Sequence, residues 1–182
     1  MFPQHSRARA LPTAEGRLYL ACWLDLATRK VVGHAMADHH RAELVVDALD
    51  MAHGPGDLEP GYVIHSDRAS EYTSSQFRHR IRELELPQSC GRTGSCFDNA
   101  AAKSFWAPLT EENGTRACPD RATARTELFT SIETFYNHRR LRKHKIYGYL
   151  TPTETRQRHQ HALAAQQSSV QDHEETSPLR AR

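Results

Sequence analysis

The chain has 182 residues, of which 38% are hydrophobic and 25% are charged, and its formal net charge is +2 at pH 7. This length suffices for one domain with a sizeable core and flanking tails, and so small a net charge does not by itself mark a nucleic-acid-binding protein. The composition excludes a membrane-spanning protein, because no apolar run approaches the roughly 20 residues that a transmembrane helix needs. Four irregularly spaced cysteines and an N-terminus without an apolar segment indicate reduced thiols and no export signal. We therefore expect a cytoplasmic protein.

The first half of the chain predicts a strand hairpin, a helix and a further strand. Residues 17–25 and 31–36 have the apolar patterns of strands, and the first of these is apolar on both faces, which indicates an interior strand. Apolar residues recur at helical spacing over 40–52. The short β-branched and aromatic run 62–64 then predicts a buried strand.

The second half of the chain is mainly helical by pattern. The predicted elements are, in order, a helix over 74–84, an edge strand at 88–90, a helix that begins at Asp98, a long helix over 121–138 and a last helix over 152–165. Residues from about 166 onward are polar, and we expect them to be disordered.

A carboxylate stands just past the predicted strand 62–64. Asp67 follows that strand, and open α/β sheets bind ligands at the carboxyl ends of their strands. A carboxylate there can hold a hard cation such as Mg²⁺ in oxygen coordination.

Two motifs carry a family resemblance. Gly61–Arg68 (GYVIHSDR) and Asp98–Phe105 (DNAAAKSF) resemble the catalytic core of insertion-sequence transposases related to retroviral integrases. In that family His-Ser-Asp-Arg-Gly is followed, at about this spacing, by Asp-Asn-Ala-x-Ala-Glu-Ser-Phe. The resemblance runs from about Leu11 to about Thr155. It implies a ribonuclease-H-like α/β fold, a mixed sheet flanked by helices.

The resemblance also implies a domain organisation. The catalytic-core-like domain is expected over 13–155, after a non-matching segment 1–12 and before a helix end and disordered tail, 156–182. The family's first strand lies mid-sheet, but residues 1–12 show no usable periodicity, and Pro3 and Pro12 limit a hydrogen-bonded ladder. We therefore expect the first strand to be missing or poorly replaced, in a truncated and degenerate copy of marginal stability.

The implied chemistry is DNA strand transfer, in which three carboxylates hold two Mg²⁺ ions. Of the three carboxylates that the resemblance implies, only Asp67 is present in this chain. Lys103 occupies the position of the third acid, and the first is absent because residues 4–10 contain no Asp or Glu. Replacing a carboxylate by an ammonium changes the local charge by two units beside divalent ions. We therefore expect Mg²⁺ binding to be impaired and this copy to be a pseudo-enzyme.

Other acids are weaker candidates for metal ligands. Asp25 ends a predicted strand, but it matches a family position that is not a ligand. Glu15, Glu111 and Glu112 read as solvated surface acids. Ala69 stands where the family has glycine, and either a poorer approach of a phosphate backbone or a neutral loop change fits this difference.

The expected partner is DNA, both transposon ends and target DNA. A basic segment, residues 139–145, has planar side chains interleaved with its cations, which favours phosphate contact over a merely solvated helix end. The candidate DNA-binding residues are Arg68, Arg92, Asn99, Arg139, Arg140, Arg142, Lys143 and Lys145.

Two alternatives to a decayed transposase stay open. One is a non-catalytic DNA-binding module, or a module that inhibits an intact transposase by forming a hetero-oligomer with it; a homo-oligomer is equally compatible. The other is a metal-dependent nuclease with rearranged ligands, whose cleavage would depend on Asp67. In each case the expected location is the bacterial cytoplasm, in association with the nucleoid.

Overall fold

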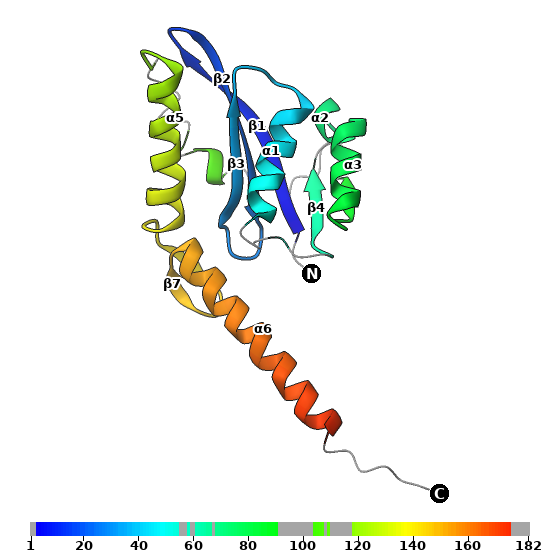
Figure 1. Cartoon of the computed structure of the whole chain (residues 1–182). Coiled ribbons are helices and arrows are strands. Elements are labelled where there is room, and N and C mark those ends of the chain that lie inside the picture. Colours follow the sequence, from blue (N-terminus) through cyan, green and yellow to red (C-terminus); the bar gives the residue numbers. More distant parts are fainter. Residues whose placement is uncertain are drawn as a thin grey trace, which may run out of the picture.

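A computed structural model describes residues 3–54, 58, 61–66, 68–90, 104–107, 109 and 118–175. Its centre is a five-stranded mixed sheet with the strand order β3-β2-β1-β4-β5 (Figure 1). The strands are β1 (Pro3–Thr13), β2 (Gly16–Asp25), β3 (Val31–Ala37), β4 (Val63–Ser66) and β5 (Gln88–Cys90). β2 runs antiparallel to both of its neighbours, β1 and β3, whereas β4 is parallel to β1 and β5 is parallel to β4.

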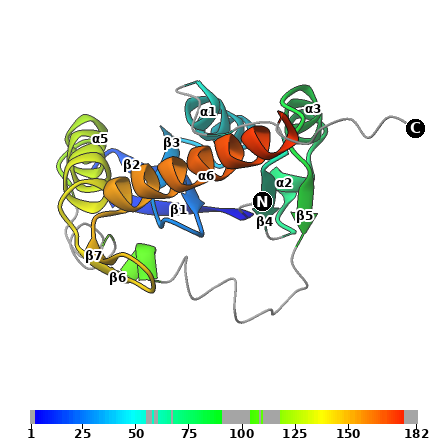
Figure 2. The same cartoon turned by 90° about the horizontal axis from the view of Figure 1, so that it is seen from below.

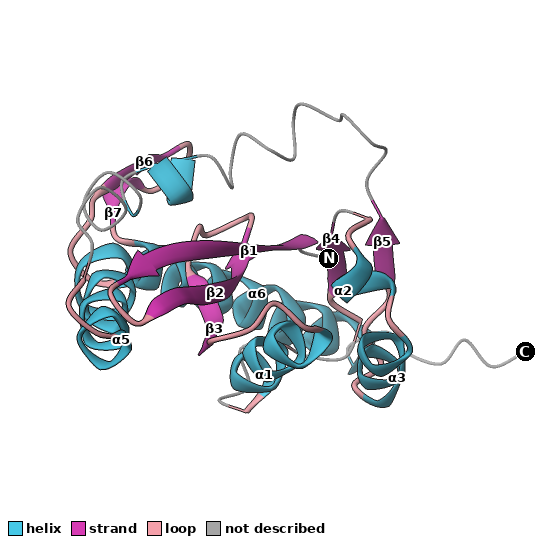
Figure 3. Ribbon diagram, turned by 90° about the horizontal axis from the view of Figure 1, so that it is seen from above, coloured by secondary structure: helices cyan, strands magenta, loops and turns pink. Residues whose placement is uncertain are grey.

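Helices cover both faces of this sheet (Figure 3). On one face lie α1 (Ala42–His53), α2 (Ser70–Thr73) and α3 (Ser75–Glu83). The other face carries α5 (Arg121–Phe129), which continues as the π-helix η1 (Thr130–Asn137). A small hairpin, β6 (Arg142–His144) and β7 (Gly148–Leu150), precedes α6 (Pro152–Glu175), which projects away from the sheet (Figure 1).

The side chains of β2 alternate between two buried clusters. Leu18 and Leu20 pack toward α5 and η1, whereas Ala21 and Trp23 pack toward α1 and α3. Burial on both faces confirms the expectation that this strand lies inside the sheet.

The expectation of a missing first strand was wrong. β1 fills the place between β2 and β4, in register with β2 from the pair Gln4–Asp25 to the pair Thr13–Gly16. The two prolines do not interrupt this ladder, because Pro3 and Pro12 lie at its ends, where a lost N–H donor costs least. The exposed rows of backbone donors that predicted marginal stability are therefore paired.

Most of the remaining described elements follow the predictions, whereas the start of the helix predicted at Asp98 lies outside the described residues. The short helix α2 and the strand β7 were not predicted, and the last turns of the helix predicted over 121–138 form the π-helix η1. The basic segment forms strand β6 instead of a plain helix end. The last helix continues beyond Ala165 to Glu175, into residues that we expected to be disordered. None of the helices in the described ranges is long and apolar enough to cross a bilayer.

Candidate nucleic-acid interface

The carboxyl end of β4 lies beside the first third of β1. The last paired positions of these strands are His5 and His65. β1 continues past this pair, and Arg7 stands two positions beyond His5, just as Asp67 stands two positions beyond His65 in the sequence. β1 thus supplies an arginine, and no carboxylate, at the corresponding position.

Four of the predicted site residues lie outside the described residues: Asp67, Arg92, Asn99 and Lys103. Within the described part of the chain, no three His, Cys, Asp or Glu side chains come together as a metal-binding group. β1 contains no Asp or Glu from Pro3 to Thr13. Among the described residues, β1 therefore offers no carboxylate to a metal ion beside β4.

The segment after β4 begins with Arg68, which is exposed. Ala69 has φ −65° and ψ 155°, an extended conformation that any residue adopts, so the change from glycine needs no strain here. Glu71 is buried, and its carboxylate lies 2.8 Å from His40 Nε2. This contact ties α2 to the start of α1. No sequence pattern predicts this contact, because the two residues lie on separate elements.

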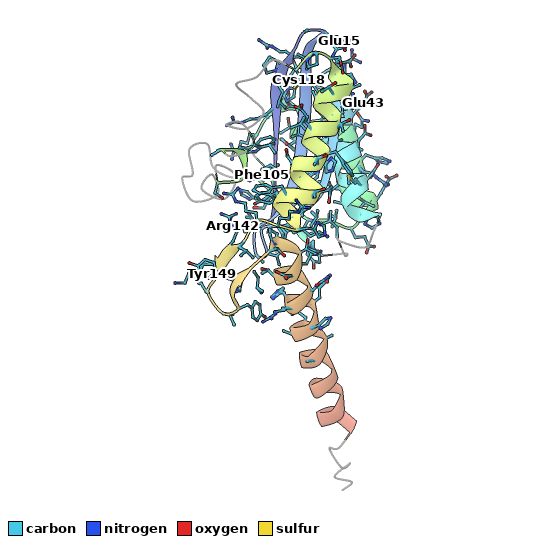
Figure 4. All side chains as sticks on the ribbon, turned by 90° about the vertical axis from the view of Figure 1, so that its left-hand side faces the viewer. Glu15, Glu43, Phe105, Cys118, Arg142 and Tyr149 are labelled. Atoms are coloured by element: carbon cyan, nitrogen blue, oxygen red, sulfur yellow. The ribbon has the colours of Figure 1, made fainter. Side chains whose placement is uncertain are left out.

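Arg142 is bonded to the protein itself. Its guanidinium donates one hydrogen bond to Tyr136 Oη and another to Ser104 Oγ, each at 3.2 Å. Ser104 follows Lys103 directly in the sequence, so this arginine joins the basic segment to the helical segment 104–107. Figure 4 shows Arg142 next to Phe105 at the base of η1, and Figure 2 shows β6 beside that helical segment, drawn in green.

Two further arginines lie over aromatic rings. The guanidinium of Arg140 is 5.7 Å from the centre of the Tyr136 ring, and that of Arg9 is 5.6 Å from the Trp106 ring. Such contacts stabilise a cation without neutralising it. Arg9 was not among the predicted site residues, since nothing in the sequence brings β1 next to Trp106.

The exposed cations of the basic segment are other residues than the arginines that contact the protein. Arg139, Lys143 and Lys145 are exposed. Tyr149, 68% exposed, is the cross-strand neighbour of Lys143 and points outward from the hairpin (Figure 4). Cations next to an exposed aromatic ring are a common surface for nucleic acid, since phosphates pair with the former and bases stack on the latter.

The other acids have structural partners. Asp25 is buried, and its carboxylate accepts hydrogen bonds from Thr28 Oγ1 at 2.8 Å and from Arg156 Nη1 at 2.7 Å. Glu15 accepts the backbone N–H of Arg121 at 3.1 Å, at the start of α5. Both observations agree with non-catalytic roles. Glu111 and Glu112 lie outside the described residues.

Comparison with known proteins first defines the class. The integrase core domain family matches residues 8–96. The catalytic core of BIV integrase aligns with a TM-score of 0.58 and 12% identity over 88% of this chain and 97% of that one. A chain of the simian T-cell lymphotropic virus intasome, solved with the PP2A regulatory subunit B56 gamma, aligns with a TM-score of 0.59 and 16% identity. The alignment covers 84% of this chain and 53% of that one. The fold is therefore that of ribonuclease-H-like integrase catalytic cores.

Sequence relatives narrow this class. The transposase of insertion element IS904 from Lactococcus lactis subsp. lactis (strain IL1403) is 37% identical over 145 residues, 79% of this chain and 56% of the relative. Transposase InsF of IS3A from Escherichia coli (strain K12) is 35% identical over 146 residues, which are 79% of this chain and 50% of the relative. The chain is therefore similar to insertion-sequence transposases with an integrase-like core over about four fifths of its own length. It spans about half the length of these relatives.

Proposed function

We propose that this chain is a transposase core that binds DNA but does not perform Mg²⁺-dependent strand transfer. One observation carries the proposal: β1 occupies the strand position beside β4 and contributes no carboxylate to it. A two-metal phosphoryl transferase depends on the placement of its ions, so the loss of ligands abolishes the chemistry and not only the affinity.

The charge at the expected metal positions supports this proposal. We take Arg7 as the residue at the first acidic position, from its offset along β1, and Lys103 as the residue at the third, from the family motif. Two cations would then replace two carboxylates, a change of four charge units relative to the family pattern. At an effective dielectric of about 20, two unit charges ~4 Å apart interact by roughly 4 kcal/mol, and a divalent ion would be repelled more strongly.

Basic side chains, which repel a metal ion, still favour the binding of DNA. The phosphate backbone attracts lysine and arginine whatever the base sequence, through the release of condensed counterions. We propose Arg139, Lys143 and Lys145 as direct phosphate contacts, because they are exposed. Arg140 and Arg142 instead support the hairpin from the protein side. Arg68, Arg92 and Asn99 remain candidates for contact beside Asp67.

A nicking assay combined with a binding assay tests the proposal. The full chain is incubated with supercoiled plasmid in Mg²⁺ or Mn²⁺, and its binding to a short labelled duplex is followed by fluorescence anisotropy. We expect salt-sensitive binding, and nicking no greater than that of the Asp67→Ala variant. Metal-dependent nicking that Asp67→Ala abolishes would refute the proposal and favour a nuclease with rearranged ligands.

A further inference from the structure

A hollow of about 350 Å³ opens between the turn that joins β2 to β3 and the β6–β7 hairpin. Five of the residues that line it carry basic side chains, and none of the described lining residues is acidic. These basic residues are Arg29, Arg142, Lys143, His144 and Lys145. We call this feature the basic hollow.

The turn on one side of the basic hollow is held in a fixed shape. Asp25 Oδ1 accepts the N–H of Ala27 at 2.9 Å, and the carbonyl oxygen of Asp25 accepts the N–H of Arg29 at 2.7 Å. Arg156 in turn holds the Asp25 carboxylate from α6. As a result Arg29 adopts φ 66°, a left-handed conformation that is uncommon for a residue other than glycine.

This turn holds Arg29 half-buried beside another cation. Its Nη1 is buried and makes no hydrogen bond to any residue that the structure describes. Burial, and then the charge of Arg142, lower the pKa of the Arg29 guanidinium. A buried donor without an acceptor is costly, and so is a pair of like charges held close together.

The nearby groups offset these cations only in part: the charge of Asp25 raises the pKa of Arg29, but less than burial and Arg142 lower it. Burial raises the pKa of the Tyr136 phenol, so its hydroxyl is uncharged at neutral pH. Both oxygens of the Asp25 carboxylate accept hydrogen bonds from other groups. The basic hollow therefore carries an excess of positive charge, and one of its lining residues, Arg29, has a buried donor without an acceptor among the described residues.

We propose that the basic hollow binds a phosphate group, with Arg29 as its principal ligand and Arg142 beside it. A phosphate oxygen would accept the hydrogen bond that Arg29 Nη1 lacks and would separate the two guanidinium charges. Lys143 and Lys145 would add charge from the rim. The phosphate can be a nucleic-acid phosphodiester, in which case the inference extends the proposed DNA contact to the β2–β3 turn, or it can be a free phosphate ion.

The test compares Arg29→Gln with Arg17→Gln, an exposed arginine at the start of β2. Binding of inorganic phosphate to the full chain is measured by calorimetry and by the rise in melting temperature, against chloride at the same ionic strength. We expect Arg29→Gln to weaken phosphate binding roughly tenfold or more, as the loss of a charged hydrogen bond predicts. We expect Arg17→Gln to bind as the wild type does.

A structural role for Arg29 would give a different pattern. Without phosphate, Arg29→Gln should melt no lower than the wild type, because it removes a like-charge contact, and Arg29→Lys should regain part of the phosphate response. If Arg29→Gln and Arg17→Gln bind phosphate equally, the inference is wrong.

A second arm identifies the source of the phosphate. If the ligand is a phosphodiester, Arg29→Gln should make the dependence of log K on log salt for duplex binding shallower by about 0.9. An unchanged dependence together with lost phosphate binding supports a free phosphate ion as the ligand. Full phosphate and duplex binding by Arg29→Gln, with duplex binding reduced in Lys143→Gln, would refute the basic hollow and leave the proposed function standing.

Discussion

Arg156 Nη1 lies 2.7 Å from Asp25 Oδ2, and the two side chains are only 6% and 3% exposed although 131 positions separate them in the sequence. The pair joins the first turn of α6 to the end of β2. The two opposite charges compensate one another, so removing one partner leaves an uncompensated buried charge.

We therefore expect Arg156→Met to lower the free energy of unfolding by about 3–5 kcal/mol. Urea denaturation followed by circular dichroism measures this change. The matched control is Arg158→Met, which replaces an exposed arginine on the same helix and should change stability little. Equal stabilities for the two variants would show that the pair does not hold α6 to the sheet.

Gly33 marks the closest approach of β3 to α1. A Cβ atom there would overlap the carbonyl oxygen of Ala48 and lie 2.7 Å from Ala52 Cβ. We expect Gly33→Ala to destabilise the protein by roughly 1–3 kcal/mol, as overpacking does in a tight core. Gly54→Ala is the control, since its nearest contact would be an ordinary 3.5 Å. A Gly33→Ala variant as stable as that control would contradict the packing of α1 on the sheet.

Glu133 makes stability depend on acid pH. The hydrogen bond from His34 Nε2, 3.2 Å away, lowers the pKa of the Glu133 carboxyl below its ordinary value of 4.5, against the opposing effect of burial. The folded state therefore favours the ionised form. Its contribution is complete above the unfolded-state pKa and is lost as the pH falls below 4.5 through the folded-state pKa.

We expect melting temperatures measured from neutral to strongly acidic pH to fall less steeply in Glu133→Gln than in the wild type. Glu43→Gln, an exposed acid on α1, should follow the wild-type curve. The account of Glu133 fails if its variant loses stability along the same curve as the wild type.

The exposed and bonded members of the basic segment should behave differently. Lys143→Gln/Lys145→Gln should reduce duplex affinity, and the slope of log K against log salt should become shallower by about 0.9 for each lost phosphate contact. Melting temperature should change little, because both side chains are exposed. Arg17→Gln/Arg41→Gln removes the same charge elsewhere and should keep the wild-type slope.

Arg142→Gln should instead lower stability, because Tyr136 and Ser104 lose a donor. If the lysine pair destabilises the protein and Arg142→Gln leaves stability unchanged, the division of this segment into exposed and bonded cations is wrong.

Sequence patterns predicted the hairpin of β2 and β3 and the strand β4 well, because apolar residues dominate each of them. β1 could not be found in this way: its residues are polar and basic, and its strand conformation depends on ten pairs with β2. The helix beyond Ala165 had a weak signal in its glutamines and glutamates, which favour helix, but the polarity of this segment indicated disorder.

The site was predictable only in part. Motif spacing predicts Asp67 and Lys103 as site residues, and both lie outside the described part of the chain. Within that part, no sequence signal distinguishes the bonded Arg142 from the exposed Lys143 next to it. That distinction depends on Ser104, which is 38 positions away. The hollow beside Arg29 likewise requires a turn and a hairpin from distant parts of the chain.

The central claim, that this core lacks a metal centre because cations occupy its acidic positions, is tested most directly by Mn²⁺ titration calorimetry on the full chain and its variants. The wild type should show no saturable binding, whereas Arg7→Asp/Lys103→Glu should bind Mn²⁺ and lose it again when Asp67→Ala is added. Saturable binding by the wild type that Asp67→Ala removes would contradict the claim.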